Sequence, residues 1–197
     1  MARDLILALI DATTATIAAH ADELTRLDQA IGDGDHGNNM TRGFQAISAQ
    51  REALAELDFG DALQKAGMTL VTTVGGASGP LYGSLLMGIG KGLRAGKDPV
   101  EALADGVDSV KKRGKSDVGA KTMLDVLVPT LEALRRDGAI SALRDMATDS
   151  REATKPMQAT RGRASFLGER SIGHYDPGAT SSCLLIHAVC DVIEAQR

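Results

Sequence analysis

The sequence predicts an all-α protein of about eight helices, and three observations support this prediction. Apolar residues recur every three to four positions through most of the 197 residues, which is the spacing of one helix face. Aromatic residues make up only 3% of the chain, so the core must consist of aliphatic residues and Met, which suit packed helices. β-branched residues cluster only at 70–74, and no second segment alternates as a partner strand would.

The first four predicted helices are separated by glycine-rich segments. A long first helix is expected over residues 3–29 and ends at an Asp/Gly loop, because a glycine inside a helix costs about 1 kcal/mol relative to alanine. Helices over 40–57 and 60–74 follow. Ser78 and Pro80 are typical of the start of a fourth helix, which continues to Leu93.

The second half of the chain predicts four more helices. Asp98 and Pro99 form a cap-and-start signal for the fifth, and residues 111–119 are expected to be a basic loop. Two further helices are predicted over residues 121–136 and 139–157. A long, lid-like loop rich in Arg and Gly is predicted over 158–178. A helix over 179–195 closes the chain. No linker divides these elements, so we expect a single domain over 1–197.

Composition excludes some classes of function. The formal net charge of −4 and the lack of an aromatic-basic platform argue against a nucleic-acid-binding surface. The chain has neither a signal-peptide pattern nor a run of 18 apolar residues. We therefore expect a soluble, cytoplasmic protein that binds neither nucleic acid nor membranes.

The strongest chemical signal is a group of carboxylates between residues 28 and 35. Asp28, Asp33 and Asp35 lie in a segment with glycines at 32, 34 and 37. Such carboxylates repel one another unless a cation or protons neutralise them, and three oxygen ligands would suit Mg²⁺ that also binds phosphates. The alternative is an Asx/Gly turn that caps the next helix. The segment is not an EF-hand, because position twelve counted from Asp33 is Phe44 rather than Glu.

Two other loops could complete a phosphate site. Residues 75–79 offer successive backbone N–H groups and the Ser78 hydroxyl at a helix start, although an ordinary cap is an equal alternative. The basic side chains of residues 151–170 could balance phosphate charge or could simply be solvated. Gly114, Lys115 and Ser116 resemble the end of a P-loop, but the glycine required earlier is Ser109 and no strand precedes it.

Seven short stretches together resemble a known family, the nucleotide-binding L subunits of dihydroxyacetone kinases. They run in order over almost the whole chain, and each alone would be a weak signal. The stretches are GDGDHG at 32–37, GGASGP at 75–80, RGK at 113–115, KTM at 121–123, GRAS at 162–165, GERSIG at 168–173 and DPGAT at 176–180.

This resemblance implies an antiparallel barrel of eight helices that binds ADP or ATP at one end. It implies that Asp28, Asp33 and Asp35 hold two Mg²⁺ ions, and that these residues and Arg163 serve catalysis. The ketone substrate would be bound by a separate K subunit. The residues implied to contact or cover the nucleotide are His36, Gly37, Asn38, Asn39, Ala77, Ser78, Gly114, Met123, Arg163, Asp176, Pro177 and Gly178.

The expected function is therefore transfer of a phosphoryl group from a Mg²⁺-bound nucleotide to dihydroxyacetone on the partner subunit. The donor is either exchangeable ATP or bound ADP that a phosphotransferase M subunit rephosphorylates. The alternatives are a kinase for another short ketose such as erythrulose, and a nucleotide-loaded module that binds a transcription factor. A helical interaction domain without nucleotide is a further alternative, and a homodimer is possible in each case.

Overall fold

The computed structural model describes residues 2–136 and 138–196, and within these residues all regular structure is helical. There are ten α-helices, one 3₁₀ segment and no strand in this described part, which confirms the predicted all-α fold. The elements are α1 (Ala2–Ala19), α2 (Ala21–Ile31), α3 (His36–Ser48), α4 (Arg51–Ala55), α5 (Phe59–Thr73), α6 (Ser78–Arg94), α7 (Pro99–Gly114), α8 (Leu124–Arg136), α9 (Ile140–Ala153), η1 (Arg163–Ser171) and α10 (Pro177–Ala195).

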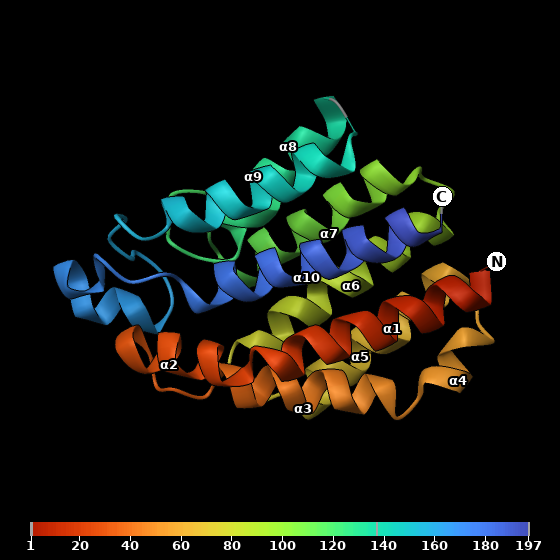
Figure 1. Cartoon of the computed structure of the whole chain (residues 1–197), viewed down its shortest axis with the longest axis horizontal. Helices are drawn as coiled ribbons and strands as arrows, with labels where there is room; N and C mark the ends of the chain where they lie inside the picture. The colour runs from red at the N-terminus through yellow and green to blue at the C-terminus, as the bar shows by residue number, and fades with distance from the viewer. Residues whose placement is uncertain (1, 137, 197) are drawn as a thin grey trace.

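The long helices lie side by side in an elongated bundle (Figure 1). Both ends of the chain lie at one end of the bundle, and η1 lies at the other, close to α2. The main core is aliphatic and includes Ile17, Leu24, Val110 and Leu124, each with 1% or less of its surface exposed. The finer expectations of an antiparallel barrel and of one domain over 1–197 stay predictions.

Glycines bring α5, α6 and α7 unusually close together. A Cβ atom on Gly83 of α6 would lie 2.7 Å from the carbonyl oxygen of Gly67 on α5. On the other side of α6, a Cβ atom on Gly88 would lie 2.7 Å from the Cα atom of Gly106 on α7. Real Cβ atoms do not approach so closely, so these positions require glycine. The joint fixes the position of α6, whose first residue is Ser78.

Two predicted helices are divided in the structure. The first bends by 56° between α1 and α2, although no Gly or Pro lies at the break. Gly37 of α3 packs directly on the carbonyl oxygen of Ala21 just after this bend, so tertiary packing sets the path of the chain there. The second predicted helix begins earlier, at His36, and is separated into α3 and α4.

Other boundaries differ near the site. The predicted basic loop at 111–119 is helical as far as Gly114, where α7 ends. Helix α8 begins at Leu124 rather than at 121, because the Asp125 carboxylate accepts the N–H groups of Gly119 and Thr122 and holds a turn. Helix α9 ends at Ala153 and α10 begins already at Pro177. The lid-like loop of 158–178 is therefore partly helical, since it contains η1.

Helix α10 is long and apolar enough, by length and composition alone, to cross a membrane, with a mean hydropathy of 1.2. The bent pair of α1 and α2 passes the same test when it is taken as one span. Helix α10 packs against α1, α2, α8 and α9, as a core helix of a globular protein does. Passing the test of length and composition is weak evidence for a membrane span. The expectation of a soluble, cytoplasmic protein stays a prediction.

Candidate functional site

Asp28, Asp33 and Asp35 meet at the end of the bundle that carries η1. Each offers a carboxylate oxygen, and these oxygens all lie within 4.8 Å of one another. Asp28 comes from the last turns of α2 and is half-buried, whereas Asp33 and Asp35 come from the short α2–α3 connection and are more exposed. Three acidic ligands at this spacing form a candidate site for a divalent cation.

Asp28 also shapes the connection that carries the other two carboxylates. Its Oδ2 atom accepts the backbone N–H groups of Asp35 at 2.8 Å and His36 at 3.1 Å, at the start of α3. A Cβ atom at Gly32 would collide with the Asp28 carboxylate, so a side chain there would displace the carboxylate from this position. Burial, together with the negative charges of Asp33 and Asp35, raises the pKa of Asp28, although the two N–H groups oppose this shift.

The opposite wall is the start of α6, preceded by the glycine-rich residues 75–77. Gly76 has a positive φ of 66°, and Ser78 is the first residue of the helix. The N-terminus of a 17-residue helix favours anions because its first N–H groups have no partner inside the helix. Ala77 and Ser78 line the same pocket as the three aspartates. The expected phosphate cradle therefore faces the candidate cation site.

His36 joins these two walls through its ring. Nδ1 lies 2.9 Å from the Ser78 hydroxyl, and Nε2 lies 2.9 Å from the Ser181 hydroxyl of α10. Burial lowers the pKa of His36 to about 4, so the imidazole is neutral at physiological pH. His36 is among the residues expected to contact the nucleotide, and both of its ring nitrogens are engaged by hydroxyl groups in this structure. The ring is thus placed to position Ser78.

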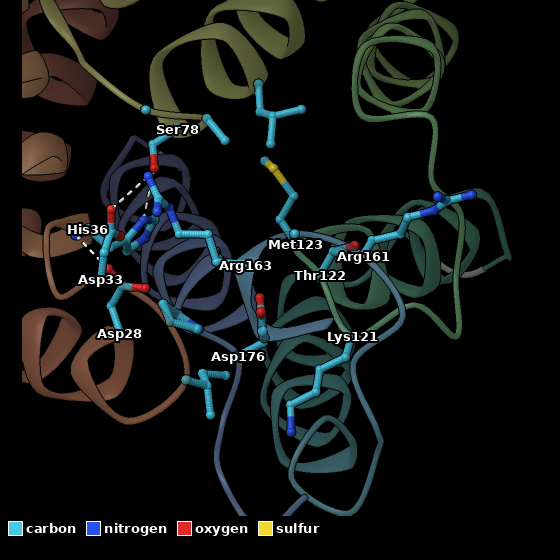
Figure 2. Close-up of a pocket in the computed structure, with 18 of the residues that line it drawn as sticks. Asp28, Asp33, His36, Ser78, Lys121, Thr122, Met123, Arg161, Arg163 and Asp176 are labelled. Atoms are coloured by element: carbon cyan, nitrogen blue, oxygen red, sulfur yellow. Dashed lines mark hydrogen bonds and ion pairs between the residues drawn. The ribbon is translucent and has the colours of Figure 1, made fainter. Parts of the chain in front are cut away.

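Residues 157–173 cover the pocket from a third side and are called the lid segment below; they overlap the predicted lid-like loop of 158–178. Arg163 at the start of η1 reaches across to Asp33, with 2.8 Å between Nη2 and Oδ2 (Figure 2). The base of the segment is held by Lys121, which is 1% exposed and donates from Nζ to the carbonyls of Met157 at 3.0 Å and Ser171 at 2.5 Å. Its side chain points away from Arg163, as Figure 2 shows.

Asp176 closes the floor of the pocket at the start of α10. Its carboxylate accepts the N–H group of Ala179 at 2.7 Å and caps the helix, with Pro177 as the first helical residue. Burial raises the pKa of Asp176 to about 7, and the nearby Asp125 charge adds to this shift. Lys121 opposes it. The pKa of this carboxyl group therefore lies far above its usual range.

A second, more apolar cavity of about 310 Å³ opens beside the first, which measures about 180 Å³. The two share Ala77, Leu81, Thr122, Met123, Arg161 and Gly162, so they form a continuous space. The second cavity alone is lined by Pro80, Val110, Gly114 and Leu124, together with Arg113 and Ser116. The acidic groups thus gather at one end of the space and most apolar side chains at the other. This would suit a ligand with an apolar part and an anionic part whose charge reaches the carboxylates through a cation.

Most of the site residues predicted from the sequence meet around this space. Those that line the two cavities are Asp28, Asp33, Asp35, His36, Ala77, Ser78, Gly114, Met123, Arg163, Asp176, Pro177 and Gly178. Gly37, Asn38 and Asn39 do not line either cavity. Gly37 packs on α2, Asn38 is exposed, and Asn39 is buried beneath Gly76 with its Oδ1 atom accepting from Arg42. The Nδ2 group of Asn39 is buried without a hydrogen-bond partner.

Sequence reasoning missed several residues of the site. Lys121 and Thr122 were assigned to a helix, and Tyr82 was not singled out, yet all three line the first cavity. Arg161, which also lines it, was named only among the basic side chains of residues 151–170. Ser181, which contacts His36, was also missed. One signal could have found it: α10 carries three consecutive hydroxyl residues at 180–182 in an otherwise apolar helix, and all three are buried.

Comparison with known proteins identifies the family. The DAK2 domain matches residues 30–191. The chain is 46% identical over 170 residues to the ADP-binding subunit DhaL of PEP-dependent dihydroxyacetone kinase 1 of Listeria innocua, and the match covers 84% of each chain. It is 44% identical over 177 residues to the ADP-binding subunit DhaL of the Escherichia coli PEP-dependent dihydroxyacetone kinase, covering 83% of this chain and 84% of that subunit.

A longer kinase and a solved structure are also similar. The D-erythrulose kinase of Mycolicibacterium smegmatis is 36% identical over 204 residues, covering 96% of this chain and 35% of the kinase. The dihydroxyacetone kinase of C. freundii in complex with AMP-PNP and Mg²⁺ superimposes with a TM-score of 0.80 and 28% identity, covering 95% of this chain and 34% of that one. The chain therefore belongs to the DAK2-domain family of dihydroxyacetone kinase subunits.

Proposed function

We propose that this chain is the nucleotide-binding subunit of a dihydroxyacetone kinase. It binds ADP or ATP through Mg²⁺ and donates a phosphoryl group to dihydroxyacetone that a separate K subunit presents. One observation carries this proposal: three carboxylates within 4.8 Å face a helix N-terminus across a pocket that continues into an apolar cavity. The subunit names of the relatives and the AMP-PNP and Mg²⁺ complex of the similar structure support it.

The residues present fit Mg²⁺ and nucleotide phosphates. Asp28, Asp33 and Asp35 would supply oxygen ligands, and their combined negative charge would suit two Mg²⁺ ions bound together with nucleotide phosphates. The partnerless Nδ2 group of Asn39 lies beneath Gly76 as a donor that a phosphate-bound 75–78 loop could use. When bound, Mg²⁺ neutralises the charge that develops on the transferred group.

The chain's own residues would position the phosphates. Ser78 and the first N–H groups of α6 donate hydrogen bonds, and Arg163 is close enough to the carboxylates to offset phosphate charge. The nucleotide base would occupy the apolar cavity between Leu81, Met123 and Leu124. The catalytic contribution of this subunit is then the positioning and neutralisation of the donor.

The identity of the phosphoryl donor and that of the acceptor rest on separate observations. Relatives with 44–46% identity are named PEP-dependent and ADP-binding, which favours ADP that stays bound and is rephosphorylated by a phosphotransferase M subunit over exchangeable ATP. A kinase for erythrulose is the second candidate, because the D-erythrulose kinase matches 96% of this chain. The acceptor would be bound by the partner subunit, so a panel of short ketoses assayed with that subunit separates the two.

The direct test of the proposed function is the Asp33→Asn variant. It keeps the size of the side chain and removes one charged ligand, so Mg²⁺-dependent ADP binding and kinase activity with the partner should both fall by about 100-fold or more. Asp149→Asn is the matched control, because Asp149 is exposed on α9. Calorimetry with and without Mg²⁺ measures the binding. If the Asp33→Asn variant binds and reacts as well as the control, the metal assignment is wrong.

A further inference from the structure

The side chain of Asn39 is buried directly beneath the glycine turn that precedes α6. Asn39 is 3% exposed and does not line the pocket, whereas Gly76 does. A Cβ atom on Gly76 would lie 3.6 Å from the Nδ2 atom of Asn39, and a Cβ atom on Gly75 would lie 3.8 Å from its Oδ1 atom. The amide group of Asn39 therefore lies against the turn, on the side that faces the interior of the bundle.

The two ends of this amide group are bonded differently. Oδ1 accepts from Nη2 of Arg42 at 2.6 Å, whereas Nδ2 is buried without a hydrogen-bond partner among the described residues. Buried donors are nearly always paired, because an unpaired one has lost its hydrogen bonds to water and gained none in return. An unpaired donor beneath a ligand-binding turn therefore indicates an acceptor that moves into place when the ligand binds.

Arg42 determines which end of the amide group faces the turn. Asn39 and Arg42 lie three positions apart on α3, so their side chains are neighbours on one face of the helix. A guanidinium group can only donate hydrogen bonds, so it must meet Oδ1 and cannot meet the NH₂ group. Nδ2 is then turned away from Arg42 and toward Gly76. Without Arg42 the amide group could turn over and present its oxygen to the turn.

The peptide groups of the turn can supply the missing acceptor. The N–H and C=O groups of a trans peptide point in opposite directions. When the N–H groups of residues 76–78 face a phosphate in the pocket, the carbonyls of the same peptide groups face away from the pocket, toward the side where Asn39 lies. Gly76 has a positive φ of 66° and no side chain, so the turn can make this adjustment without a steric clash.

We propose that Arg42 is a positioning residue for nucleotide binding, because it fixes the Asn39 amide so that Nδ2 donates to a carbonyl of the Gly75–Gly76 turn when the turn binds phosphate. This inference rests on the proposed function, since it takes a nucleotide phosphate to be the ligand of the turn. Arg42 acts only through Asn39. Its removal should therefore cost little in a chain that already lacks the Asn39 amide.

A double-mutant cycle tests this dependence. Full-length Arg42→Ala, Asn39→Ala and the double variant are titrated with ADP in the presence of Mg²⁺. Each single change is expected to weaken binding by about 5-fold, the effect of one hydrogen bond. The double variant should bind less than about 2-fold more weakly than Asn39→Ala. Arg136→Ala, which removes an exposed arginine at the end of α8, is the control for the loss of one positive charge and should bind as the unchanged chain does.

NMR of the Asn39 side-chain amide gives a readout that a merely structural role of Arg42 would not change. The Nδ2 hydrogens should shift downfield when the unchanged protein is saturated with ADP and Mg²⁺, because they gain an acceptor. In Arg42→Ala, saturated in the same way, this shift should be reduced.

Three results would overturn the inference: additive losses in the cycle, an Arg42→Ala variant that binds ADP like the control, or Nδ2 hydrogens that do not respond to ADP. Additive losses would mean that the charge of Arg42 acts on the phosphate directly. Failure of the unchanged protein to bind ADP would instead contradict the proposed function, so the two failures are distinguishable.

Discussion

The carboxylate connection, residues 28–36, and the lid segment meet in the ion pair of Asp33 and Arg163, but they are held in place differently. The backbone of the carboxylate connection is arranged mainly by contacts within the segment, since the Asp28 carboxylate accepts N–H groups seven and eight positions ahead of it. Distant contacts add to this, because Ile31 packs against Ala159 and Ala164 of the lid segment. The lid segment is held by a residue that is far away in the sequence. Lys121 donates to the carbonyls of Met157 and Ser171, which lie 36 and 50 positions after it. Contacts between residues close in sequence therefore arrange most of the carboxylate connection, whereas contacts between residues far apart in sequence position the lid segment.

This difference has a physical consequence for stability. The carboxylate connection depends most directly on the end of α2 and the start of α3, so it should change less than the lid segment when the rest of the site loosens. The lid segment depends on Lys121, which is buried at the base of the pocket close to the buried carboxyl group of Asp176. Burial lowers the pKa of Lys121 and raises the pKa of Asp176. A change at Lys121 should alter the lid segment more than the carboxylate connection.

The largest effect is expected for Asp176→Asn, as a pH dependence of stability. Asp176 has a pKa of about 7 in the folded protein and about 4 when unfolded. A raised folded pKa gives stability that is complete below pH 4 and is lost as the pH rises through 7. The unchanged protein therefore loses stability between pH 4 and 7, whereas the Asp176→Asn variant does not lose this contribution. The free energy of unfolding of the variant minus that of the unchanged protein should rise by at most about 4 kcal/mol over this range.

Urea unfolding at a series of pH values measures this difference. Asp98→Asn is the matched control, because Asp98 makes the same kind of cap at the start of α7 but is exposed. Asparagine is a good helix cap, so both variants should fold. Equal pH dependence in the Asp176 variant and the control would show that burial of the Asp176 carboxyl does not govern stability in this range.

A smaller effect is expected for Lys121→Met. Two backbone carbonyls lose their donor while the aliphatic bulk is kept, so stability should fall by about 2 kcal/mol. Hydrogen exchange should quicken in residues 157–173 and stay unchanged at the start of α3. Lys65→Met, a change of an exposed lysine on α5, is the control. Equal acceleration in the lid segment and in α3 would contradict the separation of the two halves.

The smallest effect on stability is expected for Arg163→Ala. The Arg163 side chain is 67% exposed, and ion pairs at such positions contribute less than about 1 kcal/mol. Under the proposed function, affinity for Mg²⁺-ADP should nevertheless fall by about 10-fold, because a cation near the phosphates is lost. Arg170→Ala changes an exposed arginine in the same segment and serves as the control. An unchanged affinity in the Arg163 variant would leave the lid segment without a role in binding.

The same distinction explains what the sequence could predict. The sequence could predict the grouping of Asp28, Asp33 and Asp35, because a short segment that contains glycines brings their carboxylates together without help from distant residues. Ser78 was readable as a helix start. The roles of Lys121 and Ser181 were not, because their partners lie tens of positions away and their residue types are ordinary for a helix. The helix bend after Ala19 was missed for the same reason, since no local residue marks it.

The glycine joint between α5, α6 and α7 has a consequence for how the family can diverge. Most core positions tolerate exchange among aliphatic residues of similar volume, and neighbouring helices shift slightly to accommodate the change. At Gly67, Gly83, Gly88 and Gly106 the backbones approach so closely that the separation of these helices depends less on side-chain volume than elsewhere in the core. Sequence drift elsewhere in the core can therefore accumulate while α6, whose first residue is Ser78, keeps its position against α5 and α7.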